Sequence, residues 1–387
     1  MRISLPPSRR RTLCYVVILF FFVLLWAPLL QMQFRTIPEV KLDENRRLAQ
    51  LPGLNKLSFR GTGFQKAFEE YYMDHFGFRS TLIYANNYLK ASQLNVSPHP
   101  NVSIGKNGWY YFDIPSQGLL FKDFMGLVRY DSVKLARLAE NLDTVHTALE
   151  QAGIPFVLMI APDKQTIYPE YMADSVPKRR SRTRLDQVLE YVREKKPHLT
   201  IVDPRADLIR AKSSLPQPLY YKIDTHWNDY GAFVAYRKLM DVLADRVPVT
   251  KAHDLDQFIV KHEVISIGDI AKMLSLEGHF SEDKWIFTLK KAPKLDFFDP
   301  GHQEPNTPES LGFEQKKSSL PRLVMYRDSF GVALVPFLAP HFSRSVFIWT
   351  YIIDYAHVRK EKPDVVVLEI VERHLDHLLE EKSIFRR

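Results

Sequence analysis

The chain has 387 residues, enough for one large domain or two of ordinary size. With 45% hydrophobic and 25% charged residues it has the composition of a folded globular protein, which excludes a collagen-like or largely disordered chain. The formal net charge of +8 includes an arginine-rich N-terminus, and the mild basicity of the rest argues against nucleic-acid binding. The single cysteine, Cys14, excludes an intramolecular disulfide and a cysteine-based zinc cluster.

An uncharged apolar segment, TLCYVVILFFFVLLWAPLL, occupies residues 12–30 and is long enough to span a bilayer as a helix. Arg9, Arg10 and Arg11 precede it, so the positive-inside rule places the N-terminus in the cytoplasm and exports the rest. A cleaved secretory signal is the alternative, although its apolar core spans only about 7 to 15 residues. We therefore predict a basic cytoplasmic tail (1–11), a membrane anchor (12–30) and an exported domain (31–387) that begins with an extended lead-in (31–62).

Three patterns describe the first half of the exported part. Residues 64–94 have helical spacing interrupted at Gly77, which predicts two helices. Residues 102–112 alternate around Asn107-Gly108, a dipeptide typical of a tight hairpin turn. Apolar residues then recur every three or four positions from Leu135 to Leu149, which predicts an amphipathic helix.

Buried strands are indicated by short, continuously apolar segments. The first is PFVLMIA at residues 155–161, and similar segments recur at 322–325, 345–349 and 364–370, with helical patterns between them. This alternation predicts an α/β fold with a parallel sheet covered by helices on both faces. Residues 291–321, which are rich in proline, are predicted to form a long loop.

Two motifs carry groups suited to nucleophilic catalysis. One is Asp224-Thr225-His226-Trp227, and the other is Tyr326-Arg327-Asp328-Ser329-Phe330-Gly331, which reads as a strand entering a turn and a helix. Ser329 is then at the carboxyl end of a strand, His226 is a candidate base, and Asp224 is a candidate group to orient the imidazole. From the pattern alone the alternatives stay open, because Asp-x-His recurs by chance and Asp-Ser after a strand is often only a helix N-cap.

A wider set of segments carries a family resemblance. DTHW (224–227), RDSFG (327–331), APDKQTIYPEY (161–171) and GKNGWYYF (105–112) together resemble the SGNH-hydrolase-like domain of the alginate O-acetyltransferases AlgJ and AlgX and their DHHW-type relatives. The likeness spans about residues 40 to 380 and implies a circularly permuted SGNH-like, flavodoxin-like fold with the Asp-x-His before the Ser. It also implies that Asp224, His226 and Ser329 form a catalytic triad.

Further site residues are less specific. The asparagine that supplies the oxyanion hole in ordinary SGNH enzymes is missing after residues 364–370, where the chain has Val371-Glu372-Arg373. Arg373 suits negative charge by its chemistry, with simple pairing to Glu372 as the alternative reading. Trp227 is a candidate to wall the site or stack on a sugar, or else a core residue. Tyr326 and Lys164 lie at the ends of predicted strands where ligands approach, and a lysine there is more often solvated.

The resemblance implies an O-acyltransferase of SGNH-like serine mechanism that acetylates an exported polysaccharide in the bacterial periplasm. It further implies a partner, a membrane-bound O-acyltransferase that supplies acetyl. We expect no cofactor and no metal, because Asp224 and His226 lack a further ligand of recognised spacing; a metal site completed by His253 or His279 is the rival reading. An acetyl esterase with the same triad and a non-catalytic binding subunit remain alternatives, and the sequence does not identify the polysaccharide.

Overall fold

The continuously apolar segments form the centre of a mixed α/β fold. The computed structural model describes residues 7–39, 47–53, 62–113, 120–177, 182–266, 268–301, 307–308, 310–316, 319–380 and 384–386. Within these residues, a seven-stranded sheet has the order β4-β3-β12-β9-β10-β8-β7. Its strands are β3 (Phe156–Ala161), β4 (Thr200–Val202), β7 (Asp296–Phe298), β8 (Leu311–Glu314), β9 (Arg322–Arg327), β10 (Arg344–Trp349) and β12 (Val365–Val371).

The predicted parallel sheet is confirmed for the strands from β4 to β10 in that order, which pair in parallel. The predicted loop at residues 291–321 is wrong, because it contains β7 and β8, which add an antiparallel edge beside β10. These two strands are only three and four residues long and lie among prolines, so the sequence shows no alternation long enough to reveal them.

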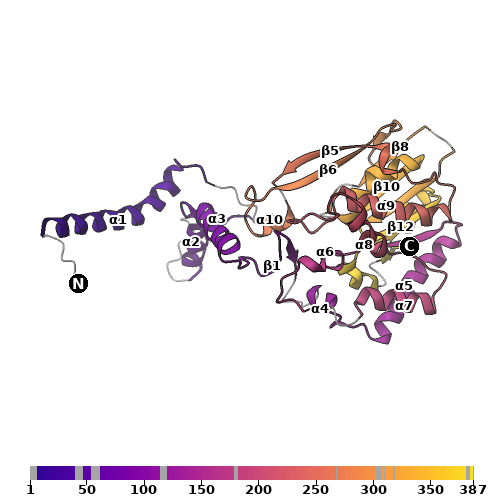
Figure 1. Cartoon of the computed structure of the whole chain (residues 1–387), viewed down its shortest axis with the longest axis horizontal. Coiled ribbons are helices and arrows are strands. Elements are labelled where there is room, and N and C mark those ends of the chain that lie inside the picture. The colour runs from indigo at the N-terminus through magenta and orange to yellow at the C-terminus, as the bar shows by residue number, and fades with distance from the viewer. Residues whose placement is uncertain are drawn as a thin grey trace. The chain divides into compact units, whose positions relative to one another are not determined.

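Helices cover both faces of the sheet (Figure 1). Alternate side chains of the central strands enter two different cores. Val157 and Met159 of β3 pack in the core that includes α8 (Arg205–Ser214) and α9 (Asp229–Ala244). Leu158 and Ile160 pack in the opposite core, with α5 (Ser132–Glu150), α7 (Arg184–Lys195) and α12 (Tyr355–Glu361). Strands buried on both faces in this way have no polar alternation, which explains their apolar runs.

Shorter elements complete the chain. Two antiparallel hairpins are formed by β1 (Val102–Ile104) with β2 (Tyr110–Phe112), as predicted, and by β5 (Phe258–Ile265) with β6 (Glu282–Leu289). The remaining elements are α4 (Leu120–Phe124), α6 (Lys164–Ile167), η3 (Pro169–Tyr171), η4 (Leu255–Gln257), α10 (Asp269–Met273), η5 (Phe330–Leu334), α11 (Val335–Leu338), η6 (Ala339–His341), β11 (Ile353–Asp354), η7 (Glu372–Leu379) and β13 (Phe385–Arg386).

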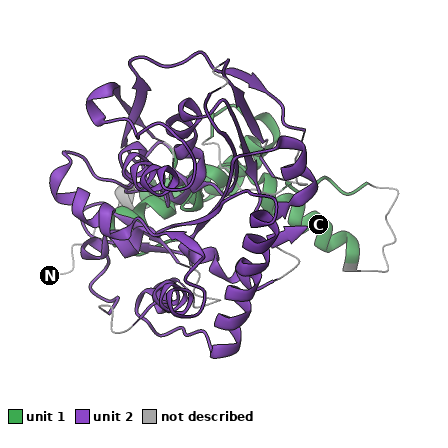
Figure 2. Cartoon of the chain, turned by 90° about the vertical axis from the view of Figure 1, so that its right-hand side faces the viewer, with its two compact units in different colours: residues 1–98, 272–277 green, residues 99–271, 278–387 purple. Residues whose placement is uncertain are grey.

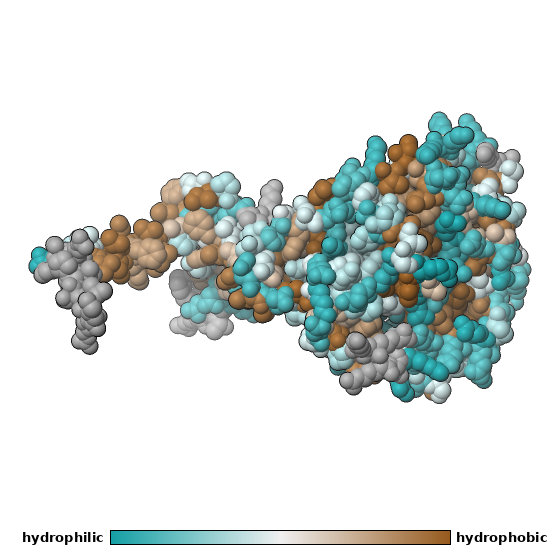
Figure 3. Space-filling model, viewed as in Figure 1, coloured by the Kyte–Doolittle hydropathy of each residue, from teal (hydrophilic) through white to brown (hydrophobic). Residues whose placement is uncertain are grey.

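The chain divides into two compact units, coloured separately in Figure 2. Residues 99–271 and 278–387 hold the sheet, and residues 1–98 with 272–277 hold α1 (Pro7–Phe34), α2 (Thr62–His75), α3 (Arg79–Tyr88) and η2 (Leu89–Gln93). The break between α2 and α3 falls at the predicted position. Residues 11–34 of α1 are long and apolar enough to cross a membrane, with a mean hydropathy of 2.7 over an 18-residue window, and Figure 3 shows this apolar surface. The division into tail, anchor and exported domain remains a prediction.

One cation of the basic run at residues 178–184 is buried. Residues 178–181 lie outside the described part of the chain, but the side chain of Arg184 is 1% exposed and pairs with Asp123 and Asp376. Its Nε donates to Asp123 Oδ2 at 2.9 Å, and Asp123 Oδ1 accepts the Arg184 backbone N–H at 2.8 Å. Arg184 therefore links α7 to α4 instead of contributing to a solvated basic surface.

We expect Arg184→Ala to lower the free energy of unfolding by about 3 to 5 kcal/mol, because it removes the charged partner of the buried Asp123 carboxylate. The matched control is Arg182→Ala, since the Arg182 side chain is 67% exposed and its ion pair with Glu190 lies in solvent. Loss of this exposed ion pair should lower the free energy of unfolding by about 1 kcal/mol or less. Denaturant unfolding of the two variants tests this, and equal losses would contradict the structural role of Arg184.

Candidate active site

A tight loop at residues 219–228 carries Asp224 and His226. Its ends are joined by an isolated β-bridge between Tyr220 and Trp227 and by the Asn228 N–H, which donates to Leu219 O at 3.0 Å. Asn228 then caps α9, its Oδ1 accepting from two backbone N–H groups of the first turn. The sequence around DTHW thus folds as a loop that enters a helix, which fixes both ends of the motif.

The ammonium group of Lys164 holds the middle of this loop. It is 2% exposed, and Nζ donates to the carbonyl oxygens of Tyr221, Lys222 and Asp224 at 3.0, 3.0 and 2.7 Å. Burial lowers the Lys164 pKa to about 8, against the raising effect of nearby carboxylates such as Asp224. The interpretation of Lys164 as a solvated or ligand-contacting lysine is therefore not supported, because its donors are used on the backbone beside Asp224.

Asp224, His226 and Ser329 form a continuous line of hydrogen bonds. Asp224 Oδ1 lies 2.6 Å from His226 Nδ1, and His226 Nε2 lies 2.6 Å from Ser329 Oγ. Burial opposes ionisation of Asp224, but the hydrogen bonds and charge of His226 and backbone N–H groups outweigh it and lower the Asp224 pKa to about 2. An ionised carboxylate only accepts, so His226 Nδ1 donates to Asp224, and Nε2 is the ring nitrogen that faces the serine hydroxyl.

Asp328 fixes the turn that carries Ser329. Its carboxylate accepts the N–H groups of Phe330 and Val371, both at 2.8 Å, and the hydroxyl of Tyr351 at 2.7 Å. Phe330 follows β9, Tyr351 follows β10 and Val371 is the last residue of β12, so one buried side chain joins the carboxyl ends of three adjacent strands. Because the Phe330 N–H is bound to Asp328, this donor at the start of η5 is already engaged.

A second carboxylate beside His226 was not predicted. Asp269 follows β5, and its Oδ2 lies 3.7 Å from His226 Nδ1. Its Oδ1 accepts the Thr225 N–H at 2.7 Å, its Oδ2 accepts the Thr225 hydroxyl, and its own N–H donates to Asp224 Oδ2 at 2.9 Å. Burial and the negative charge of Asp224 raise its pKa. It is 43 residues beyond His226 in a segment without a motif, so no sequence signal pointed to it.

Arg373 and Glu372 bind other partners and not each other. Arg373 Nη1 pairs with Asp163, and its guanidinium lies 5.2 Å from the centre of the Phe330 ring, next to Ser329. Arg373 also lines a small hollow of about 10 Å³ together with Thr225. Glu372 Oε2 instead accepts the Asp163 N–H at 3.0 Å and the Thr166 hydroxyl at 2.6 Å. Of the two, only Arg373 is brought beside the triad.

Trp227 and Tyr326 are core residues. Trp227 is 1% exposed, and its Nε1 donates to Phe330 O at 3.0 Å. Tyr326 is fully buried in the core that holds α5, and its hydroxyl lies near Asp354. Neither ring is available to stack on a sugar, because both π faces are packed inside the protein. Trp227 joins the two motifs, because it directly follows His226 and its indole N–H binds the residue that follows Ser329.

Three side chains of the site could also offer metal ligands. One atom each of Asp224, His226 and Asp269 lies within 4.8 Å of the others. These atoms already serve hydrogen bonds that orient the imidazole and the Thr225 backbone. The two histidines considered as further ligands lie elsewhere, His253 against Tyr236 and His279 against Phe280. The hydrogen-bonding pattern favours an oriented base over a metal centre.

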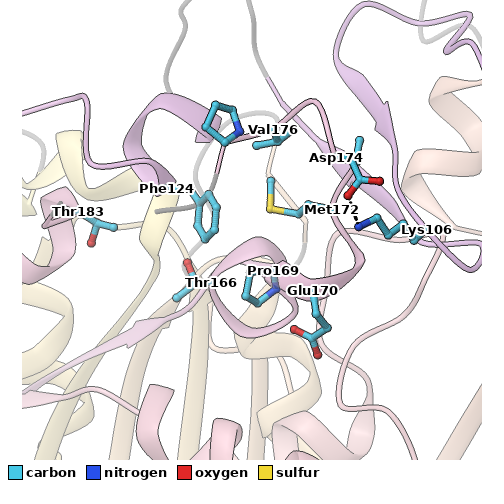
Figure 4. A pocket seen from close by; sticks show the side chains of 11 residues that line it. Lys106, Phe124, Thr166, Pro169, Glu170, Met172, Asp174, Val176 and Thr183 are labelled. Atoms are coloured by element: carbon cyan, nitrogen blue, oxygen red, sulfur yellow. Dashed lines mark hydrogen bonds and ion pairs between the residues drawn. The ribbon is translucent and has the colours of Figure 1, made fainter. Parts of the chain in front are cut away.

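A pocket of about 560 Å³ lies next to the loop after β3 (Figure 4). Phe124, Met172 and Val176 are grouped within it, and the ion pair of Lys106 with Asp174 lies at one side. Pro177 and Thr183 also line the pocket, as does Thr166, whose hydroxyl binds Glu372. Thr166 therefore links the wall of the pocket to Glu372, the residue before Arg373.

Comparison with known proteins bears on this arrangement. Residues 102–288 match the family described as the SGNH hydrolase-like domain of acetyltransferase AlgX. The resemblance is confirmed. The chain is 28% identical over 184 residues to a probable alginate O-acetylase AlgJ of Pseudomonas syringae pv. tomato, which covers 47% of this chain and 43% of that protein. The alignment therefore spans less than half of that relative, and the family match includes Asp224 and His226 but ends before Ser329.

Solved structures support the fold. PatB1 of Bacillus cereus superposes with a TM-score of 0.52 at 14% identity, over 72% of this chain and 98% of that one. A second structure of PatB1, with a sulfonyl adduct, gives a TM-score of 0.50 at 13% identity, over 70% of this chain and 96% of that one. At this identity the comparison shows a shared fold, which agrees with the SGNH-like α/β class predicted from the motifs.

Glu372 gives a pH-dependent prediction. Burial, with the negative charge of Asp163, raises its pKa from 4.5 to about 8. The folded state therefore binds a proton that the unfolded state releases between these pH values, so this group's stabilising contribution is present below pH 4.5 and is lost as pH rises to about 8. We expect the free energy of unfolding of Glu372→Gln to fall less steeply over this pH range than that of wild type, because glutamine stays neutral.

The measurement is the free energy of unfolding of wild type and Glu372→Gln across this pH range. Glu190→Gln is the control, because Glu190 forms an exposed ion pair. A wild-type curve parallel to that of Glu372→Gln would show that the raised pKa is wrong.

Proposed function

We propose that this protein is an O-acetyltransferase that modifies a polysaccharide through an acetyl-serine intermediate. The observation that carries the proposal is the hydrogen-bond line from Asp224 through His226 to Ser329, with both contacts at 2.6 Å. In the first half-reaction, Ser329 Oγ attacks the acetyl carbonyl carbon while His226 Nε2 accepts the hydroxyl proton. His226 then returns this proton to the leaving group of the donor, and Asp224 stabilises the imidazolium.

The second half-reaction reverses these roles. A sugar hydroxyl gives its proton to His226 Nε2 and attacks the acetyl carbon, and the bond to Ser329 Oγ breaks as the serine regains its proton. Arg373 is the residue we propose to face the negative charge that develops on the carbonyl oxygen, because its guanidinium lies over Phe330 beside the serine. The Phe330 N–H is less suited to this role, since it donates to Asp328.

The proposal also covers the acceptor and a membrane partner. One relative is named as an alginate O-acetylase, which supports an exported polysaccharide as acceptor here. The pocket lined by Phe124, Met172 and Val176 offers a place for polymer. We further propose that α1 anchors the domain on the periplasmic side of the bacterial inner membrane, close to a membrane-bound O-acyltransferase that delivers acetyl.

Hydrolysis is the nearest alternative, because the same three groups would make an acetyl esterase if water replaced the sugar hydroxyl. The use of the fold for binding alone is a second alternative. The short contacts of His226 with both Asp224 and Ser329 count against it, since a binding subunit has no need of an oriented base.

We expect an arylsulfonyl fluoride to label Ser329, because the attack of an activated hydroxyl on sulfur forms a stable sulfonyl ester. The intact mass of wild type should increase by one sulfonyl group, and Ser329→Ala should remain unlabelled. Ser213→Ala is the control, since it removes a serine from the exposed end of α8. Labelling of Ser329→Ala at the wild-type rate would rule out Ser329 as the nucleophile.

Asp224→Asn should lower kcat with an activated acetyl ester by roughly 10³- to 10⁴-fold, because the amide favours the wrong imidazole tautomer and no longer stabilises the imidazolium. Steady-state kinetics of the variant test this against Asp283→Asn, a change at an exposed carboxylate on β6. A loss of less than about tenfold would argue that Asp224 has no part in the chemistry.

A further inference from the structure

One face of α3 and η2 is exposed and carries no charge. Leu82 and Leu89 are seven positions apart, so they lie on the same side of the helix, and they are 55% and 52% exposed. The exposed residues of this uncharged face are Thr81, Leu82, Ala85, Asn86, Tyr88 and Leu89. Lys90 is the one charged residue in the sequence from 80 to 98, whereas a quarter of the whole chain is charged.

The turn between α2 and α3 packs against the end of α1, within the same unit. Gly77, between α2 and α3, lies so close to α1 that a Cβ there would be 2.1 Å from Pro28 O and 2.8 Å from Gln31 Cβ. Glu39 reinforces the joint, because its carboxylate accepts the Phe78 N–H at 3.1 Å and the Ser80 hydroxyl at 2.8 Å. The start of α3 is therefore held against the last turns of the apolar helix.

Gln31 seals the joint from the side of α1. It is 3% exposed, its Nε2 donates to Ile37 O at 2.6 Å, and its Oε1 accepts the Ile37 N–H at 3.1 Å. Residues 28–39 are thus built into the packing of α3, which is the arrangement of a retained helix. Removal of α1 as a signal peptide would remove the contacts that Pro28 and Gln31 make.

We propose that the uncharged face of α3 and η2 lies in the lipid–water interface of the bilayer that α1 spans. The inference rests on the proposal that α1 is a membrane anchor. A helix that begins at the point where α1 leaves the bilayer is at the depth of the headgroups, where leucine and tyrosine side chains are stable and a charge-free surface gives up little hydration. When α3 and η2 are bound at the interface, they restrict how far residues 62–98 can tilt relative to α1.

The test uses the full chain in phosphatidylcholine vesicles, without any partner protein. Cys14→Ser removes the native thiol, and single cysteines at Leu82, Leu89 or Val133 carry an environment-sensitive fluorophore. Val133 is the matched control, because it is also an exposed apolar residue, 69% exposed, but lies on α5 of the other unit. A fourth label at Val23 reports whether α1 is in the bilayer.

Lipids with a nitroxide near the headgroup should roughly halve the fluorescence at positions 82 and 89, since interfacial helices insert by about 5 to 10 Å. The label at Val133 should keep its intensity. Quenching at Val23 by nitroxides deep in the acyl chains, with none at 82 and 89, would overturn the proposal and leave the face to a protein partner. No quenching at Val23 would overturn it by removing the anchor. Sulfonyl labelling of Ser329 is independent of all these outcomes, so the failure of one proposal is distinguishable from that of the other.

Discussion

Bringing an imidazole to a serine 103 residues later in the chain requires two loops to be held still at one edge of the sheet, and this constraint shapes the surrounding structure. Lys164 binds three carbonyls of the first loop, and Asp328, in the second loop, binds groups at the carboxyl ends of three strands. Both clamps are buried, so their hydrogen bonds compete little with water. The short contact between His226 and Ser329 depends on these clamps.

The clamps also explain the charge distribution around the site. Asp163 pairs with Arg373 and gives its N–H to Glu372, while Asp269 binds the Thr225 backbone and hydroxyl. Burying several ionisable groups together is costly unless each has a partner. Here, the partners belong to different loops, so satisfying the buried groups also ties the loops to each other. The electrostatics and the geometry of the site therefore have a common origin.

The central strands could be predicted, because apolar runs are local in sequence. The pattern around Asp224, His226 and Ser329 left alternatives open, and only the family resemblance grouped these three residues in one site. Asp269 could not be predicted, since it begins α10 in the connection between β5 and β6, and only the tertiary fold brings this connection beside His226. The ligand contacts suggested for Trp227, Tyr326 and Lys164 are not supported, because the three side chains are buried. Residue type and motif neighbourhood do not determine whether a side chain points into the core, and all three do.

The measurement that tests the account most directly is peptide mass mapping of the full chain after brief exposure to an activated acetyl donor. The account predicts an acetyl group on the peptide containing Ser329, stable when acceptor is withheld and transferred to sugar hydroxyls when an oligosaccharide is added. Acetylated oligosaccharide formed without any acetyl on Ser329, even after rapid quenching, would contradict the acetyl-serine mechanism.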